Sequence, residues 1–492
     1  MPATSSLAVT RSAVRVAPDP SRVLAKSFLP GGEVRADGRM RIEHILLRIL
    51  ALSESQVDDA LDEVRGRFSR RHRDLERILE ANFAIVEAHV HDAQTLSLAR
   101  RLLIGAYFTQ EYGVEAAALS NPSIVAAPNQ EGLAEGAVRF VLSLRAIGEG
   151  HISSIEFRLG VVDAAGRIEL DPPGPHVSLA MRQVPDFDKP VFRSKLRELR
   201  AYDAVAAGIL DSLPDDFSLH QLECEIRAAL TRLGENASGS TRMLHWLASS
   251  NYVSRFSADS TLSERILFPA GPPESQGMED ARFVRFTGDD GVCTYFATYT
   301  AFDGYRILPQ LIETPDFLTF RTATLNGECA RNKGIALFPR KLGGRYAALA
   351  RLDNENNFFM SSDNIHFWHE SRVIQRPKHS WEIIQLGNCG SPIETEAGWL
   401  VITHGVGTMR QYALGALLLD REDPTLVLGQ LAEPLLTPAE DERDGYVPNV
   451  VYSCGSMIAA EHLILPYGHS DVGTRIATVR LDDLLGALTA SC

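Results

Sequence analysis

Cysteine is scarce in this chain of 492 residues, and none of it is arranged in pairs. The six cysteines are scattered along the chain at Cys224, Cys293, Cys329, Cys389, Cys454 and Cys492. Without a Cys-x-x-Cys spacing they predict neither a thiolate zinc site nor the disulfide framework of a secreted protein. Reduced thiols of this kind are typical of a cytosol, so we expect a cytoplasmic protein with no bound metal.

Long apolar runs are also missing. No stretch approaches the roughly 18 consecutive apolar residues of a membrane-spanning helix, so we expect no membrane span. Residues 1–39 lack the continuous apolar core of a signal peptide. We interpret them as a partly ordered lead-in segment.

Positive charge is the minority sign. Lys and Arg number 49 against 63 Asp and Glu, and the formal net charge is -14. So acidic a surface repels phosphate backbones and anionic lipids, and we expect neither a nucleic-acid nor a membrane partner. It does not exclude a small anion held by a few converging cations. With 45% hydrophobic and 23% charged residues the composition is globular, and the length allows more than one domain.

The sequence predicts two helical segments. In residues 40–120, apolar side chains recur three and four positions apart, and Ser53–Gln56 has the pattern of a capping box. The basic run Arg65–Arg73 is interleaved with acidic residues, which indicates a solvated or self-paired helix face. A helical insertion follows at about 175–265, with a second capping box at Ser218–Gln221.

The rest of residues 121–492 has the pattern of short strands separated by Gly, Pro, Asn and Asp. Asp316–Phe320 and Asp363–Phe367 share the pattern Asp-x-x-x-Phe at an offset of 47 residues, which is typical of a propeller blade, although two short matches also arise by chance. Clusters of short strands without helices between them favour a β-propeller or a sandwich over a parallel α/β sheet.

Motifs that can carry chemistry begin at residue 121. They are, in order, Asn121-Pro122-Ser123, Leu144-Arg145 with His151, Glu279-Asp280-Ala281-Arg282, Asn332-Lys333 with Ala336–Pro339, Arg351, Gly390–Trp399, His404-Gly405-Val406, Tyr412, Tyr446–Val451 and Tyr467–Asp471. In kind and order they resemble glycoside hydrolase family 130, the β-mannoside phosphorylases and mannosidases, over roughly 121–485. The family's Glu-Asp-Pro-Arg motif has Ala281 in place of its proline here, a change that removes no chemical group.

The resemblance implies a mainly β fold. Residues 121–492 would form a five-bladed β-propeller catalytic domain, interrupted by the α-helical insertion at about 175–265. The N-terminal α-helical segment at 40–120 and this insertion depart from the compact members of the family.

The resemblance also assigns roles to residues. It implies that Asp280 is the general acid, that Arg145, Lys333, Arg351, His404 and Tyr412 bind phosphate, and that Asn121, Glu279, Arg282 and Asp471 contact the substrate. Breaking a glycosidic bond needs a proton donor for the leaving oxygen and a nucleophile at the anomeric carbon. In phosphorolysis the phosphate is itself the nucleophile, so cations that hold it replace a second carboxylate. In the family the acid is thought to pass its proton through a sugar hydroxyl.

We therefore expect an inverting phosphorylase that cleaves β-mannosides, preferably β-1,2-linked manno-oligosaccharides, to give α-mannose 1-phosphate. Inorganic phosphate is the co-substrate in this hypothesis, and no metal or organic cofactor is required. Assembly into a homo-oligomer stays open. One alternative is an inverting β-mannosidase in which Glu394, Glu396 or Glu442 activates water. The other is a sugar-binding propeller without catalysis.

Each candidate also has an ordinary structural interpretation. Arginine and lysine at strand ends, such as Arg145 and Lys333, are usually solvated or paired in ion pairs. His404 could be a structural histidine, and Asp471 could simply close a turn. The shared order of the motifs is what favours the functional interpretation.

Overall fold

The computed structural model describes residues 7–31 and 38–490. The chain divides into two compact units. Unit 1 comprises Met1–Pro18, Ala117–Pro173 and Leu179–Cys492, and unit 2 comprises Asp19–Ala116 with Gly174–Ser178. Part of the expected lead-in segment, residues 1–6 and 32–37, lies outside the described residues, as does Cys492. Across the described ranges, no helix is both long and apolar enough to cross a membrane.

Unit 2 is mainly helical. Its elements are β2 (Val23–Ser27), α1 (Arg41–Leu50), α2 (Glu54–Phe68), α3 (Leu75–Val86), α4 (Leu98–Tyr107) and β3 (Thr109–Gly113). Because β2 pairs with β3, this unit begins before the predicted helical region at 40–120. The predicted capping box is present at the start of α2, where Ser53 accepts a hydrogen bond from the Gln56 amide. The basic run is self-paired, as its interleaved charges predicted; Arg65, for example, lies 2.6 Å from Glu76.

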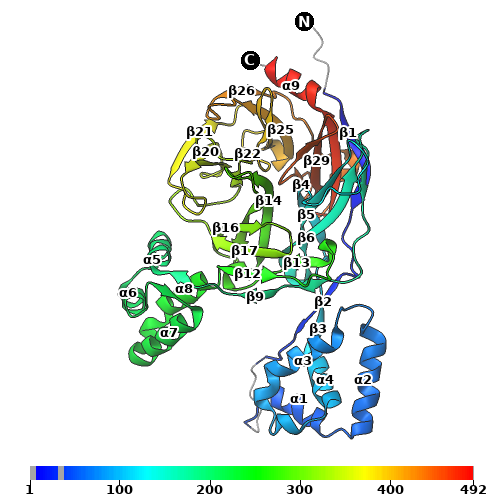
Figure 1. The fold of residues 1–492 in the computed structure, drawn as a ribbon, viewed down its shortest axis with the longest axis vertical. Coiled ribbons are helices and arrows are strands. Elements are labelled where there is room, and N and C mark those ends of the chain that lie inside the picture. The colour runs from blue at the N-terminus through cyan, green and yellow to red at the C-terminus, as the bar shows by residue number, and fades with distance from the viewer. Residues whose placement is uncertain (1–6, 32–37, 491–492) are drawn as a thin grey trace. The chain divides into compact units, whose positions relative to one another are not determined.

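Unit 1 is mainly β (Figure 1), and most of its strands fall into five groups of antiparallel neighbours. The first group is β4 (Ala118–Ala126), β5 (Val138–Ile147), β6 (Ser153–Val162) and β7 (Ile168–Leu170). The second is β14 (Gly277–Thr287), β15 (Cys293–Phe302), β16 (Ile307–Thr314) and β17 (Thr319–Thr324). These two groups share one twelve-stranded sheet, joined where Gly277 pairs in parallel with Ser153.

Three further groups follow along the chain. The third is β18 (Ala336–Leu337), β19 (Tyr346–Ala350), β20 (Asn357–Ser362) and β21 (Glu370–Gln375). The fourth is β22 (Gln385–Asn388), β23 (Ile393–Thr395), β24 (Gly398–Val406), β25 (Tyr412–Leu419) and β26 (Val427–Gln430). The fifth is β27 (Val451–Tyr452), β28 (Met457–Ala459), β29 (His462–His469) and β30 (Gly473–Arg480), and α9 (Leu481–Thr489) follows it.

The helical insertion lies between the first and second groups. It contains β8 (Ser178–Leu179), β9 (Met181–Gln183), β10 (Phe187–Asp188), α5 (Lys189–Glu198), α6 (Ala204–Asp211), β11 (Asp216–Phe217), α7 (Leu219–Leu233), α8 (Ser238–Ala248), β12 (Tyr252–Arg255) and β13 (Arg265–Leu267). The capping box predicted at Ser218–Gln221 is present at the start of α7. Phe192 of α5 and Leu244 of α8 belong to the same hydrophobic core as Phe157 and Phe283 of the sheet.

The short sequence repeat falls at equivalent places in neighbouring groups. Asp316 lies in the turn between β16 and β17, and Asp363 lies in the turn between β20 and β21. The Asp316 carboxylate accepts hydrogen bonds from the amides of Leu318 and Thr319, which fixes the first of these turns. The offset of 47 residues therefore separates two corresponding hairpins.

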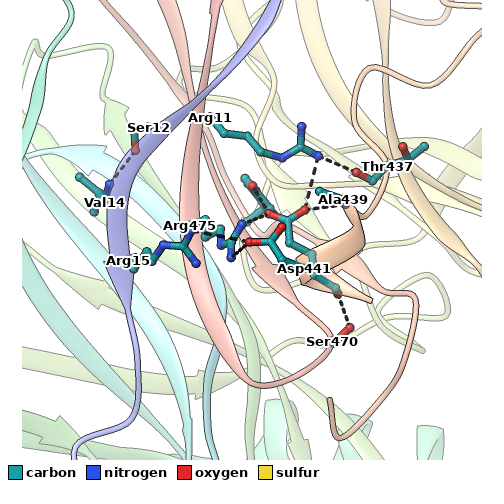
Figure 2. A network of polar contacts seen from close by, with 11 residues as sticks. Arg11, Ser12, Val14, Arg15, Thr437, Ala439, Asp441, Ser470 and Arg475 are labelled. Carbon is teal, nitrogen blue, oxygen red and sulfur yellow. Dashed lines mark hydrogen bonds and ion pairs between the residues drawn. The ribbon is translucent and has the colours of Figure 1, made fainter. Parts of the chain in front are cut away.

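The predicted lead-in segment also contains β1 (Val9–Val16), which pairs antiparallel with β30 near the other end of the chain. From Ser12 to Val16, more buried and more exposed side chains alternate, a pattern that fits one covered face. Arg11 of β1 donates to the Thr437 carbonyl at 2.7 Å and to the Glu442 carboxylate at 3.4 Å (Figure 2). The expectation of a merely lead-in segment missed this strand, because its partner lies more than 450 residues away.

Candidate active site

The site contains two β-bulges. The pairing of β4 with β5 shifts between Ser120 and Ser123, and the pairing of β14 with β15 shifts between Glu279 and Arg282. Each shift contains a residue other than glycine in left-handed backbone, Asn121 with φ 49° and Asp280 with φ 56°. Such backbone costs about 1–3 kcal/mol and persists only where surrounding contacts enforce it.

The two bulged residues meet. The Asn121 amide donates to one carboxylate oxygen of Asp280 at 2.5 Å. The same oxygen lies 3.9 Å from the guanidinium of Arg145, which comes from β5. The general-acid candidate is therefore held between an amide and a cation, each from a strand of the neighbouring group.

Glu279 joins two of the predicted phosphate ligands. Arg145 donates to one of its carboxylate oxygens at 2.7 Å, and Lys333 donates to the other at 2.6 Å. The Glu279 side chain is 10% exposed and that of Lys333 30%, so the shared carboxylate is the more shielded part of this ion triad. Glu279 was predicted to contact the substrate; here its two oxygens are occupied by Arg145 and Lys333.

The surrounding charges act on the acid. Burial by itself raises the pKa of the Asp280 carboxyl. The positive charges of Arg145, Lys333 and Arg282 outweigh burial and hold the pKa of Asp280 below its ordinary value. Asp471 responds in the opposite sense: burial, with the negative charges of Asp280 and Glu279, raises its pKa despite the nearby Arg145.

Arg351, His404 and Tyr412 form a second group. The guanidinium of Arg351 lies 3.2 Å from Nε2 of His404, whose ring stacks on Tyr412 with centroids 6.2 Å apart. Burial and the charges of Arg351 and Arg282 hold the pKa of His404 well below its ordinary value, so the imidazole is neutral. Because a guanidinium only donates, Nε2 of His404 is the acceptor and its proton sits on Nδ1, 3.6 Å from the Cys389 sulfur.

Arg282 connects the two groups. Its guanidinium donates to the carbonyl and side-chain oxygens of Asn388, at 2.9 and 2.6 Å, and to the Tyr452 hydroxyl at 2.8 Å. With 2% exposure and these partners, Arg282 acts on Asp280 through its charge. The pKa of the neighbouring Cys389 thiol is raised to about 12. Burial is the cause, and it outweighs the charges of Arg282 and Arg351, which act in the opposite direction.

The structure thus gathers all ten candidates in two adjoining groups. Around Asp280 lie Asn121, Arg145, Glu279, Arg282, Lys333 and Asp471, and beside Arg282 and Cys389 lie Arg351, His404 and Tyr412.

Three neighbours of the site were missed by the sequence: Asn388, Cys389 and Tyr452. One signal was available, because the tripeptide Cys-Gly-Ser occurs twice, at 389–391 and 454–456, after the first strands of the fourth and fifth groups. The two copies touch: a side chain at Gly390, whose φ is +108°, would meet the Cys454 carbonyl oxygen. The tripeptide marks a close crossing of two backbones next to Arg282.

The three glutamates proposed as hydrolytic bases are engaged elsewhere. Glu442 is fully buried in the network of Figure 2 and lies 2.9 Å from Arg475. Glu394 lies 2.7 Å from Arg340. Glu394 and Glu396 line a cavity of about 820 Å³, together with α9 and the far end of β14, and no lining residue of that cavity belongs to the two groups above.

Comparisons with known proteins identify the family of this chain. A family model described as beta-1,4-mannooligosaccharide phosphorylase, that of glycoside hydrolase family 130, matches residues 255–490. The 1,2-beta-oligomannan phosphorylase of Thermoanaerobacter sp. (strain X514) is 34% identical over 219 residues, which are 43% of this chain and 71% of that protein. The beta-1,2-mannobiose phosphorylase of Listeria innocua is 31% identical over 237 residues, 46% of this chain and 65% of that protein.

A solved structure of the Listeria innocua beta-1,2-mannobiose phosphorylase with beta-1,2-mannobiose is also similar. It is 21% identical, with a TM-score of 0.46, over 77% of this chain and 93% of that chain. The sequence matches are decisive for the family: this chain belongs to glycoside hydrolase family 130.

Proposed function

We propose that this protein is an inverting mannoside phosphorylase that acts on β-1,2-linked manno-oligosaccharides and releases α-mannose 1-phosphate. Membership of family 130 supports phosphorolysis of a mannoside. The preference for the β-1,2 linkage is supported by the two relatives above, both named for β-1,2-linked substrates. Inorganic phosphate is the co-substrate, and the reaction requires no metal or organic cofactor.

One observation carries the proposal: cations from separate strand groups converge around Asp280, which is held in a fixed position. Arg145 and Lys333 lie near Asp280. Arg351 and the neutral His404 form a neighbouring group, and Arg282 lies close to both groups. Arginine offers a planar fork to a phosphate, and lysine offers a compact charge. In a chain of net charge -14 such a cluster concentrates an anion locally.

We assign the proton transfer to Asp280 and its orientation to Asn121. The cluster holds the pKa of Asp280 low while no anion is present. A phosphate bound among the cations offsets their charge, so the pKa of Asp280 rises and the acid gains its proton. Phosphate binding would in this way supply the nucleophile and prepare the acid together.

Anion binding also needs the cations to be available. Arg145 and Lys333 are each paired with Glu279 here, whereas Arg351 has His404 as its hydrogen-bonding neighbour. We therefore assign the main phosphate contacts to Arg351, His404 and Tyr412. Arg145 and Lys333 serve chiefly to balance Glu279 and the incoming anion, and Asp471 faces the donor sugar.

We also propose that the five strand groups are the blades of a five-bladed β-propeller. Two features support this arrangement. β1 from the N-terminus completes the last group by pairing with β30, as a strand that joins the first and last blades would. The site residues Asn121 and Asp280 lie in the first strands of successive groups, and Arg282 reaches the first strands of two more.

The test is sugar release measured with and without phosphate. β-1,2-Mannobiose should be cleaved only when phosphate is supplied, and α-mannose 1-phosphate should appear in equal amount to the freed mannose, followed by phosphorus and proton NMR. Equal rates of mannose release in phosphate-free buffer would contradict phosphorolysis and favour the hydrolase.

A further inference from the structure

Glu442 is a buried carboxylate for which the proposed reaction has no use. Its side chain is fully buried, and one of its oxygens accepts from the Tyr467 hydroxyl at 2.7 Å and from Arg475 at 2.9 Å. The other oxygen accepts from the Ala439 amide at 2.9 Å and from Arg11 at 3.4 Å. A buried charge is costly unless it is paired in this way, so the four donors fix Glu442 in place.

The backbone of Glu442 also contacts the turn that carries Asp471. Its carbonyl oxygen accepts a hydrogen bond from the buried Ser470 hydroxyl at 2.5 Å (Figure 2). Ser470 is tied to the same loop at two more points, since its amide donates to Val450 at 2.8 Å and its carbonyl accepts from Val447 at 3.1 Å. The residue that follows Ser470 in the chain is Asp471.

The turn that carries Asp471 requires such support. Ser470 and Asp471 both adopt left-handed backbone, with φ 47° and 48°. Two consecutive residues of this kind, neither of them glycine, are strained and relax when their restraints are removed. The hydrogen bonds of Ser470 with Glu442, Val447 and Val450 are restraints that hold this turn.

We propose that Glu442, anchored by Arg11 of the N-terminal strand, is a positioning residue that holds Ser470 and hence Asp471 at the donor sugar. The strand β1 is then a working part of the active site, although it lies at the opposite end of the sequence. The role of Asp471 in this inference rests on the proposed function, whereas the coupling from β1 to the turn does not.

The chain offers a matched control on the same strand. Arg15 lies 3.6 Å from Asp441, with both side chains about 60% exposed, and it makes no contact with Glu442 among the described interactions. Replacing Arg15 with Met removes an exposed ion pair, which is worth little to stability. Replacing Arg11 with Met removes a bond to Glu442 itself.

The experiment compares the full-length variants Arg11→Met, Ser470→Ala and Arg15→Met with the wild type. We expect Arg11→Met and Ser470→Ala to lower kcat/KM for the mannoside about 10- to 100-fold, mainly through KM, because a small misplacement of a binding group has effects of this size. KM for phosphate should be unchanged, and Arg15→Met should match the wild type. A merely structural role would reduce the fraction of active protein and leave both KM values alone.

A double variant and a readout that needs no activity complete the test. Because Arg11 and Ser470 act along one route, the double variant should lose no more than the larger single loss. Hydrogen exchange followed by mass spectrometry should speed up in peptides spanning 466–474 in Arg11→Met and Ser470→Ala, but not in Arg15→Met. Unchanged exchange there overturns the inference, whatever the enzyme does. If the wild type shows no phosphorolysis, only the proposed function is overturned.

Discussion

Asp280 illustrates how much of this site depends on single residues. It combines a left-handed backbone, a 2.5 Å bond from Asn121 and three nearby cations. The family motif pointed to Asp280 from the sequence, but neither the bulge nor the partner amide is visible in the letters Glu-Asp-Ala-Arg. These depend on register shifts between strands, which are set by contacts distant in sequence.

Replacing Asp280 with Asn tests its role as the acid at almost constant shape. The amide cannot deliver a proton, so kcat/KM should fall about 10²- to 10⁴-fold, the usual contribution of general acid catalysis. Asp289→Asn is the control, because Asp289 is 69% exposed and only pairs with Lys341. A variant Asp280→Asn with near wild-type activity, or an equal loss in the control, would contradict the assignment.

The acid should also respond to phosphate through its pKa. The free site holds the pKa of Asp280 low, so its protonated form is lost as pH rises through that low value. Bound phosphate offsets the cations and raises the pKa, which extends the protonated form to higher pH. The alkaline limb of the rate profile should therefore move to higher pH at saturating phosphate than at limiting phosphate. Superimposable limbs would mean that the anion does not bind next to Asp280.

At the scale of elements, the site is assembled where strands cross closely. Gly390 follows β22 and lies against the backbone at Cys454, just after β27. Asn388, two residues before Gly390, accepts from Arg282. The crossing therefore holds the acceptors that keep Arg282 beside Asp280.

Gly390→Ala should destabilise the protein and weaken activity together. An added methyl group meets the Cys454 carbonyl, and the φ of +108° is strained for any other residue, so the loss should exceed about 2 kcal/mol. Gly208→Ala is the control: Gly208 lies within α6 with open space around it, and alanine there should stabilise by about 0.5–1 kcal/mol. Thermal unfolding checks both signs, and an unchanged midpoint for Gly390→Ala would show that the crossing is not tight.

Local signals predicted the helices well and the long-range elements poorly. The capping boxes at Ser53 and Ser218 begin α2 and α7, as expected, because a cap and an apolar stripe lie within a few residues. Strand β1 was not predicted, since its partner β30 is far away in the sequence. Likewise Tyr452 enters the site only through the fold, by accepting from Arg282.

At the scale of the whole molecule, the helices divide between the two units. The helices α5 to α8 share a core with Phe157 and Phe283 of the first two strand groups, so they are part of the structural body of unit 1. Unit 2 has its own core, including Leu46 and Phe83. The proposed chemistry itself involves unit 1 alone, because all ten candidate residues belong to it.

The central claim is that Arg351, His404 and Tyr412, next to the cations around Asp280, hold a phosphate that faces Asp280 across the sugar. A crystal structure grown with inorganic phosphate and mannose tests this most directly. The account predicts a phosphate bonded to Arg351, His404 and Tyr412, with the mannose ring between that anion and Asp280. A phosphate bound elsewhere, or a mannose that does not separate the anion from Asp280, would contradict it.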